Sequence, residues 1–339
     1  MKKNFNILSV LLAVLLAFNF ASCGDTEMDY SNFYQTEDEE PDTDTDTNTD
    51  TDTDTDTDTD TDTDTDTDTD TDTDTDVDTD VVSQISAMTF NIRYETDEED
   101  EANNWVNRRG AAVAVVADKK PTVWGVQECE YDQKVYLDTY CAGYSSIGVG
   151  RTDGGIKGEF MAIYYDTELV KLHDWDTFWL SETPDTPSKG WDASTYRTAT
   201  WAIFELIETG EKFFMINTHV DHEGSTAQTQ SMILIDSKIE ELNTEDLPVI
   251  VMADFNRAYA ASMFDAVRDY LLDSRQEATD NNNDLYTATY NGWGASSGYI
   301  VDIIMVCGFD VLTYDVITEQ YNNVTYVSDH YPVIADLEF

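Results

Sequence analysis

The segment Pro248-Val-Ile-Val-Met-Ala-Asp-Phe-Asn256 decides the fold class of this chain of 339 residues. The apolar run 249–253 predicts a buried strand that leads directly into Asp254 and Asn256. A carboxylate or an amide at the end of an apolar strand is costly unless it is hydrogen bonded or binds a cation. Active sites of layered α/β folds gather at strand ends, so the segment predicts such a fold with a polar site beside Asp254.

The same pattern, a polar residue in or next to an apolar run, occurs at five more places. These places are Asn91 after Met88-Thr-Phe90, Gln127-Glu128, Asn217-Thr-His219, Val301-Asp302 and Ser328-Asp-His330. One such place has an ordinary explanation, but this many in one chain indicate a shared cleft. Several carboxylates cannot share a cleft unless a cation is present, so a metal ion is expected there.

Apolar patterns along the rest of the chain predict strands that alternate with helices, followed by strands alone. The predicted strands cover residues 87–93, 122–127, 160–165, 171–180, 195–207, 212–219, 248–253, 299–306, 311–318 and 331–339. Helices are expected at 103–116 and after Gly224 as far as about Leu242. Mixed strands in this number predict an α/β (α+β) fold, a four-layer sandwich of two mixed β-sheets packed face to face with helices on the outer faces.

Residues 1–23 have the pattern of an export signal that ends in Cys23. Lys2 and Lys3 precede an apolar run at 7–20, and small residues stand directly before the cysteine. This is typical of bacterial lipoproteins, in which the cysteine is lipidated and becomes the new N-terminus. An ordinary secretory signal with an incidental cysteine is the alternative. We expect a protein of the bacterial cell envelope, outside the cytoplasm, that is lipid-anchored to a membrane and has no transmembrane span in its mature form; surface exposure is compatible with this.

Residues 24–80 form an acidic linker that cannot bury a core. Asp occupies every even position of 42–80 except Asn48, mostly in alternation with Thr, and 24–80 carries 26 acidic residues without Lys or Arg. Neighbouring charges lie within a Debye length of about 8 Å, so the tract repels itself. We expect a disordered spacer that holds the next domain away from the membrane. A low-affinity calcium sponge is the alternative, but an open repeat offers no rigid cage.

Residues 81–339 are long enough to bury one large core and are expected to form one domain. Of the chain's 70 acidic residues 44 lie here, against 16 of its 18 basic residues. This surplus excludes non-specific DNA or RNA binding as the main function, because such binding depends on Lys and Arg. Cys129 and Cys141 could pair in an oxidising compartment, although their spacing does not establish it.

Taken in order, the motifs resemble the endonuclease/exonuclease/phosphatase superfamily, whose best known members are DNase I-like nucleases. The resemblance extends over nearly all of 85–339. The segment Thr177-Phe-Trp-Leu-Ser-Glu-Thr-Pro184, followed by Gly190-Trp-Asp192 and Arg197, is similar to an uncharacterised bacterial lipoprotein branch of that superfamily. The resemblance implies a DNase I-like sandwich and cleavage of phosphoester bonds by activated water.

The resemblance implies a metal side of the site. Glu128 and Asn91 match ligands of a divalent cation, and Asp329 would lie beside them. Oxygen ligands fit Mg²⁺ or Mn²⁺ better than zinc. Asp254 matches the carboxylate that orients or deprotonates the attacking water, and Asn256 would hydrogen-bond that water or a phosphoryl oxygen.

Two histidines complete the implied catalytic set. His330 matches the histidine near the scissile phosphate, with Asp302 as its carboxylate partner. His219 matches the second histidine, and Glu159 in Gly158-Glu-Phe160 stands where its Glu partner is found.

Substrate binding is assigned to Arg197 and His222. Arg197 stands at the position of an arginine that clamps the phosphate, and His222 lies in His219-Val-Asp-His222. The ordinary alternatives are a solvated loop histidine and a surface salt bridge between Arg197 and Glu159.

Ordinary alternatives also exist for two other positions. Asp302 could solvate a strand edge, and Asn91 could cap a turn. One residue departs from the superfamily pattern, since Ala253 stands where a Gly is usual. An Ala is tolerable there if the backbone is ordinary β-strand and destabilising if φ is positive.

These observations favour a divalent-metal-dependent phosphohydrolase that acts outside the cytoplasm on a small phosphorylated molecule. A secreted nuclease, with nucleic acid as substrate only, is the close alternative and should prefer polymers in a salt-sensitive way. A zinc hydrolase built on His219 and His222 lacks further histidines at zinc-site spacing. A non-catalytic surface binding module is a third class, but it would have no physical reason to keep the whole set of polar positions.

Overall fold

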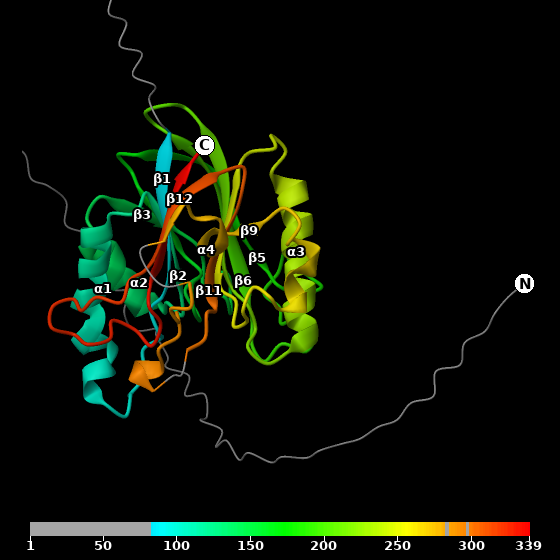
Figure 1. Ribbon diagram of the computed structural model, residues 1–339. Helices are drawn as coiled ribbons and strands as arrows, with labels where there is room; N and C mark the ends of the chain where they lie inside the picture. The colour runs from blue at the N-terminus through cyan, green and yellow to red at the C-terminus, as the bar shows by residue number, and fades with distance from the viewer. Residues whose placement is uncertain (1–82, 282–284, 296–297) are drawn as a thin grey trace, which may run out of the picture. The chain divides into compact units, whose positions relative to one another are not determined.

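The computed structural model describes residues 83–281, 285–295 and 298–339 (Figure 1). The predicted signal peptide 1–23 with Cys23, and the predicted linker 24–80, lie outside these residues. Among the described helices, none combines the length and the apolar character needed to cross a membrane.

Within the described ranges, seven strands form the first sheet in the order β10-β12-β13-β1-β2-β4-β3. β1 (Gln84–Asn91) lies in the middle, parallel to β2 (Val123–Gln127) and antiparallel to β13 (Val333–Glu338). The others are β3 (Tyr144–Ile147), β4 (Ile163–Asp166), β10 (Asp280–Asn281) and β12 (Asp310–Val316). Near-continuous apolar runs suit β1 and β2, because both faces of these strands are buried.

The second sheet of the described region has the order β5-β6-β7-β8-β11-β9. Its strands are β5 (Val170–Trp179), β6 (Thr198–Leu206), β7 (Lys212–His219), β8 (Val249–Asp254), β9 (Leu272–Asp273) and β11 (Asp302–Cys307). β7 and β8 are parallel, and β11 is antiparallel to β8. This register places Asp254 opposite His219 on one side and opposite Asp302 on the other.

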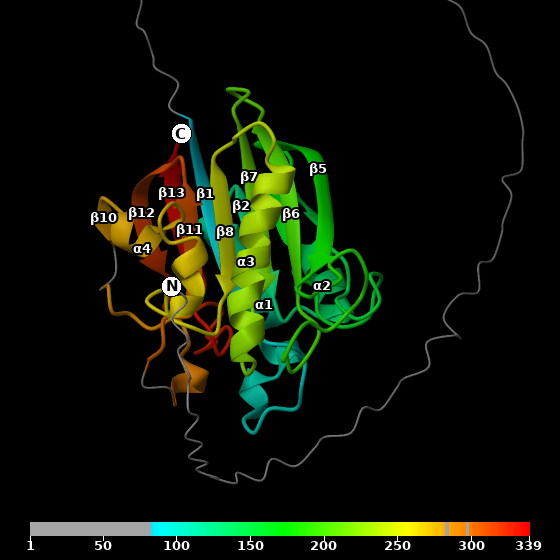
Figure 2. The same cartoon turned by 90° about the vertical axis from the view of Figure 1, so that its right-hand side faces the viewer.

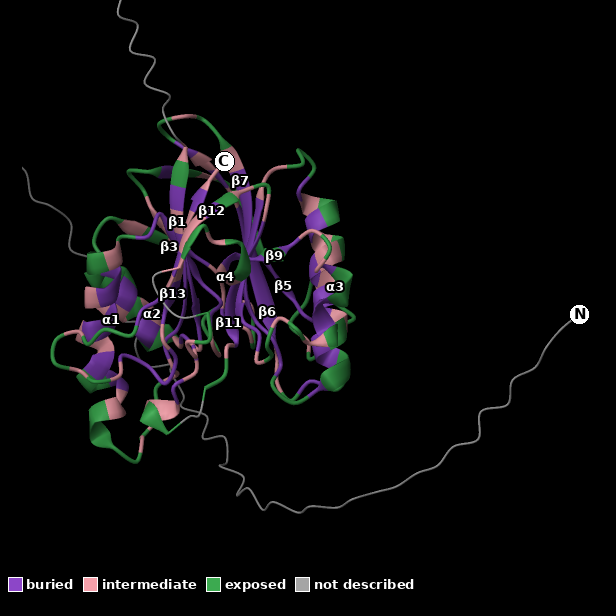
Figure 3. Cartoon of the chain, in the orientation of Figure 1, coloured by how far each residue is buried: buried purple, intermediate pink, exposed green. Residues whose placement is uncertain are grey.

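The main core lies between the two sheets, where strands coloured as buried face each other (Figure 3). Ala87 and Val123 of the first sheet belong to one apolar cluster with Phe204, Met215 and Ile304 of the second. Alternating side chains from two facing sheets fill such a layer, as the sequence pattern predicts.

Helices cover the two outer faces (Figures 1 and 2). α1 (Trp105–Lys119) and α2 (Tyr131–Tyr140) pack on the first sheet, and α3 (Ser225–Leu242) packs on the second. Met232 and Ile235 of α3 contribute to a cluster with Phe214 and Val251. The predicted α/β four-layer sandwich is therefore confirmed.

Several short elements were not predicted. They are α2, β3, β9, β10, α4 (Ser274–Glu277) and the 3₁₀ turns η1 (Glu101–Asn103), η2 (Ser262–Ala266) and η3 (Gly292–Gly294). α2 buries only Gln133 and Leu137, so its sequence has no apolar stripe to reveal a helix.

The departure at Ala253 is harmless to the backbone. Ala253 lies inside β8 and pairs with Thr218 on one side and Ile303 on the other, which is ordinary strand geometry. Cys129 and Cys141, whose pairing the sequence leaves open, are both buried free thiols.

Candidate active site

The ends of β1, β7, β8 and β11 bring the predicted polar residues together. Asp254 is their centre: its Oδ2 accepts a hydrogen bond from Asn91 Nδ2 at 2.9 Å. The same oxygen lies 3.5 Å from His219 Nε2 and 3.6 Å from His330 Nε2. Burial, aided by the charge of Asp302, raises the pKa of Asp254 to about 7, although His330 opposes this shift.

Asp302 holds His330 in place. The two side chains are buried, and His330 Nδ1 lies 2.8 Å from Asp302 Oδ2. Burial alone would lower the pKa of His330, but the carboxylates of Asp302 and Asp254 raise it to about 10. His330 is thus a charged donor at neutral pH. With 1% of its surface exposed, Asp302 does not solvate a strand edge, so that alternative interpretation is wrong.

His219 is held in one tautomer by Asn256. Asn256 Nδ2 donates to Val220 O and to His219 Nε2, both at 2.9 Å, so Nε2 is the acceptor and Nδ1 carries the proton. His219 Nδ1 lies 4.0 Å from Glu159 Oε2 and has no hydrogen-bond partner among the described residues, so the partnership of these two side chains stays a prediction. Burial and the charges of Arg197 and Arg151 hold the pKa of His219 well below its ordinary value, so this histidine is neutral.

Glu159 and Arg197 have separate partners and do not form the surface salt bridge that was the alternative. Glu159 Oε2 accepts from Arg151 Nη1 at 2.7 Å. Burial, with the charge of Glu128, raises the pKa of Glu159 to about 7 against the effect of Arg151. Glu159 and Arg151 both lie in the wall of the active-site pocket.

Arg197 is 5% exposed and lies between Asp221 and His222. Its Nε is 3.5 Å from Asp221 Oδ2, and its Nη2 is 3.1 Å from His222 Nδ1. Nη1 of Arg197 is buried without a hydrogen-bond partner among the described residues, so it has donor capacity left for a ligand. His222 is half-exposed at the pocket rim, where it contacts Arg197.

The predicted metal side is built around Glu128. Its Oε1 accepts from Asn91 Nδ2 at 3.1 Å, and its Oε2 accepts the Tyr94 N–H at 3.2 Å. The guanidinium of Arg93 lies 3.7 Å from Glu128 Oε2 and 3.8 Å from Asp329 Oδ2. Asn91 also accepts the Arg93 N–H at 2.9 Å, which is the turn-capping contact considered as an alternative. The roles of Asn91, Glu128 and Asp329 as metal ligands stay predictions.

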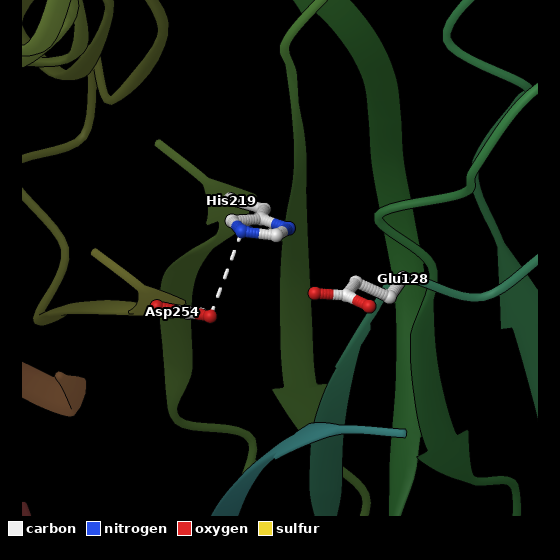
Figure 4. Close-up of side chains that lie close together, drawn as sticks. All are labelled: Glu128, His219 and Asp254. Atoms are coloured by element: carbon white, nitrogen blue, oxygen red, sulfur yellow. Dashed lines mark ion pairs between the residues drawn. The ribbon is translucent and has the colours of Figure 1, made fainter. Parts of the chain in front are cut away.

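The donor set fits a hard divalent cation. Ligand atoms of Glu128, His219 and Asp254 lie within 4.8 Å of one another, and Figure 4 shows the three side chains pointing toward a common space. A second such group joins Asp254 to Asp302 and His330. His219 Nε2 and His330 Nδ1 have hydrogen-bond partners, and the other members of these groups are carboxylates, whose oxygens suit Mg²⁺ or Mn²⁺. Of the groups found in the described region none contains His222, which leaves the zinc alternative without support.

One pocket of about 1010 Å³ collects most of the predicted residues. It is lined by Glu128, Glu159, Arg197, His219, His222, Asp254, Asn256, Asp329 and His330. Asn91 and Asp302 lie behind this surface, where they bind Asp254 and His330. The site is therefore a single cleft with buried supporting residues.

Sequence reasoning missed a larger part of the pocket wall. The arginines and aromatic residues of that part include Arg93, Arg151, Arg257, Tyr290 and Tyr299. Arg93 and Arg257 follow the motif residues Asn91 and Asn256 closely, and this nearness was a usable signal. The other three come from loops, where no periodic pattern marks them.

Comparison with known proteins agrees with this geometry. The Endonuclease/Exonuclease/phosphatase family matches the chain over residues 88–330. A solved member of that family from Bacteroides thetaiotaomicron is 34% identical, with a TM-score of 0.71, and the match covers 76% of this chain and 98% of that one.

Two further proteins are similar to this chain. A mannosyl-6-phosphatase from Bacteroides thetaiotaomicron is 34% identical, with a TM-score of 0.70 over 75% of this chain and 100% of that one. An uncharacterised protein of Acanthamoeba polyphaga mimivirus is 25% identical over 256 residues, which are 69% of this chain and 92% of that protein. The chain belongs to the endonuclease/exonuclease/phosphatase family, whose members hydrolyse phosphoester bonds.

Proposed function

We propose that this protein is a Mg²⁺- or Mn²⁺-dependent phosphohydrolase that removes phosphate from a small phosphorylated molecule, with a sugar phosphate as the first candidate. The observation that carries the proposal is that His219, Asp254, His330 and Glu128 line one pocket, with Asp302 paired to Asp254 in the sheet and bonded to His330 from behind. The 34% identity to a mannosyl-6-phosphatase supports a sugar phosphate.

The bound cation would supply positive charge beside the phosphoryl oxygens, and Glu128 would hold it with Asp329 and Asn91 nearby. Asp254 is placed to orient a water molecule and to accept its proton, since its raised pKa makes it a usable base. His330 keeps its proton through Asp302 and is placed to donate to a phosphoryl oxygen.

The charge distribution favours a small substrate over a nucleic acid polymer. Arg93 and Arg151 of the pocket face carboxylates at 3.7 and 2.7 Å, so they are not free to follow a phosphate backbone. Polymer binding without a basic surface is weak, which speaks against a nuclease. The nuclease is nevertheless the alternative that the activity test includes.

We further propose that the domain is lipid-anchored in the bacterial cell envelope, outside the cytoplasm. The support is the sequence pattern that ends in Cys23 and the acidic repeat that follows it. The repeat would keep the pocket away from the membrane surface, where soluble substrates reach it.

Hydrolysis by the purified chain tests the activity. The panel holds mannose 6-phosphate, inositol phosphates, p-nitrophenyl phosphate, bis-p-nitrophenyl phosphate, plasmid DNA and RNA, each with Mg²⁺, Mn²⁺ or EDTA. His330→Ala should abolish turnover. His173→Ala is the matched control, because His173 of β5 pairs with Glu205 of β6 and does not line the pocket.

Each result has a clear meaning. Metal-dependent turnover of a sugar phosphate that is lost in His330→Ala supports the proposal. Preference for DNA or RNA, suppressed by salt, would establish the nuclease alternative. A folded chain that hydrolyses nothing with any metal would move the binding module to first place.

A further inference from the structure

A second pocket of about 610 Å³ adjoins the active-site pocket. Ala258 and Ile300 line both pockets, so the two meet at these residues. Ala258 follows the catalytic segment Asp254–Asn256 by two residues, which places the entrance of the second pocket next to the predicted site of phosphate cleavage. A substrate whose phosphate lies at Asp254 can therefore extend past Ala258.

Two tyrosines of different character line the second pocket. Tyr259 is fixed, because its hydroxyl donates to Leu271 O at 2.8 Å and its ring packs against Phe264. Tyr286 is 83% exposed, and Tyr299 at the junction with the active site is 63% exposed. Aromatic rings that face water at a cleft are suited to a ligand that is apolar on its faces and polar at its edges.

The two arginines of the second pocket do not form an anion site. Arg268 binds Asp265 Oδ1 at 2.9 Å and Tyr259 O at 3.0 Å. Arg275 binds Asp273 Oδ2 at 3.0 Å and Leu285 O at 2.7 Å, which fixes the wall next to Tyr286. Each guanidinium is paired with a carboxylate that offsets its charge, and only its Nε has no hydrogen-bond partner among the described residues, so a neutral ligand fits better than a second phosphate.

We propose that the second pocket binds the sugar unit next to the phosphorylated one, so that the substrate is an oligosaccharide with a phosphate on its terminal sugar. This inference rests on the proposed sugar phosphatase activity and extends it. A sugar ring stacks on exposed tyrosines and keeps its hydroxyls in water. An alkyl chain needs an enclosed apolar channel, which side chains as exposed as Tyr286 do not make.

The test compares mannose 6-phosphate with a mannobiose that carries the phosphate on position 6 of its terminal sugar. The full chain should hydrolyse the disaccharide with a kcat/KM about tenfold higher. Tyr286→Ala should remove this advantage and leave mannose 6-phosphate within about twofold of the parent chain. Tyr286→Phe should keep the advantage, because it keeps the ring. Tyr140→Ala is the control, since Tyr140 is 57% exposed on α2 and lines neither pocket.

Equal kcat/KM for both sugars and no selective effect of Tyr286→Ala would overturn this inference and leave the phosphatase proposal standing. Hexyl and methyl phosphate are compared in parallel. If Tyr286→Ala selectively impairs hydrolysis of hexyl phosphate, the pocket takes an alkyl chain and the saccharide assignment is wrong.

If no phosphorylated sugar is hydrolysed, calorimetric titration with unphosphorylated mannotriose tests whether the second pocket binds a saccharide at all. Binding that weakens about tenfold in Tyr286→Ala, but not in Tyr140→Ala, would support the saccharide pocket while the proposed activity fails. No binding by the parent chain would reject both.

Discussion

Gly125 on β2 lies against Asn217 on β7, so close that a Cβ atom at position 125 would come within 2.5 Å of Asn217 Cγ. Asn217 Nδ2 donates to Val126 O and Ala162 O, both at 2.9 Å, and Asn217 Oδ1 accepts from Gln127 Nε2 at 2.7 Å. One buried amide thus joins the two sheets directly below the site, and only glycine leaves room for it.

Gly125→Ala should therefore destabilise the domain by about 2 kcal/mol or more, because the methyl group displaces a fully hydrogen-bonded buried amide. Thermal unfolding should show a loss of roughly 5 °C. Gly110→Ala is the control: Gly110 lies in α1, a Cβ there meets only Asn322 Nδ2 at 3.9 Å, and alanine favours a helix. Equal unfolding temperatures for the two variants would contradict the proposed role of Gly125.

The His330–Asp302 pair should act as one unit in catalysis. Asp302→Asn and His330→Ala should each lower kcat by about 10²–10⁴-fold. Asp302→Asn removes the carboxylate that orients His330 and keeps it protonated, and His330→Ala removes the imidazole itself. The double variant should be little worse than His330→Ala alone. Steady-state kinetics of the three variants measure this, and fully multiplicative losses would show that the residues act independently.

Cation binding should be visible without turnover. Glu128, Asp254 and Asp329 repel one another, so a bound Mg²⁺ or Mn²⁺ should stabilise the folded chain. A ligand present at 100 times its Kd adds about 2.7 kcal/mol to the free energy of unfolding, which corresponds to a rise of several degrees in the melting temperature. Glu128→Gln should abolish most of this rise, and EDTA should reverse it. Glu319→Gln, a surface residue paired with Lys119, is the control and should keep the rise. An unchanged rise in Glu128→Gln would remove Glu128 from the metal site.

Asp221 should make the stability of the folded domain depend on pH in the acidic range. Burial alone would raise its pKa, but hydrogen bonds from Gly224, Ser194 and Glu223 hold the pKa below its ordinary value. Its stabilising contribution is therefore complete above the unfolded-state pKa of about 3.9 and is lost as the pH falls through the lower folded-state value.

Asp221→Asn should consequently be less stable than the parent chain at pH 7, and this deficit should shrink in strong acid. Denaturant unfolding at pH 7 and at about pH 3 compares the two chains. The variant should also raise the KM, because Arg197 loses the carboxylate that positions it. A deficit that grows on acidification would contradict the assignment.

The lipid anchor is tested in the bacterial host. Cys23→Ala should abolish incorporation of labelled fatty acid and release the chain from the membrane fraction. Cys307→Ala, which alters a cysteine of β11 far from the N-terminal segment in sequence, should change neither. Membrane association that persists in Cys23→Ala would favour an attachment other than the predicted lipid.

The sequence predicted the strands around the site because an apolar run that ends in Asp254 and Asn256 is visible locally. It also predicted which residues gather there, through their place at strand ends and through the family resemblance. The register that sets Asp254 beside His219 and Asp302 is a non-local property, since it depends on ladders between distant segments.

What the sequence could not reveal is the loop-built part of the site. Arg151 and Tyr299 line the pocket from loops. The conformation of a loop depends on its tertiary contacts, and its sequence shows no hydrophobic periodicity that would reveal it. The same holds for α2, whose buried face contains one apolar side chain, Leu137, and therefore shows no helical pattern.

The pairing of Asp254 with His219 and Asp302 in the sheet determines which sequence changes the site can tolerate during evolution. An insertion or deletion within β7, β8 or β11 shifts a whole strand by one position and turns the row of reacting groups to the wrong face. Side chains that line the pockets from outside these strands, such as Tyr286 and Tyr299, are under no such constraint, because replacing one of them leaves every ladder in register. Proteins with this row in common can thus diverge widely in what they accept while keeping their chemistry.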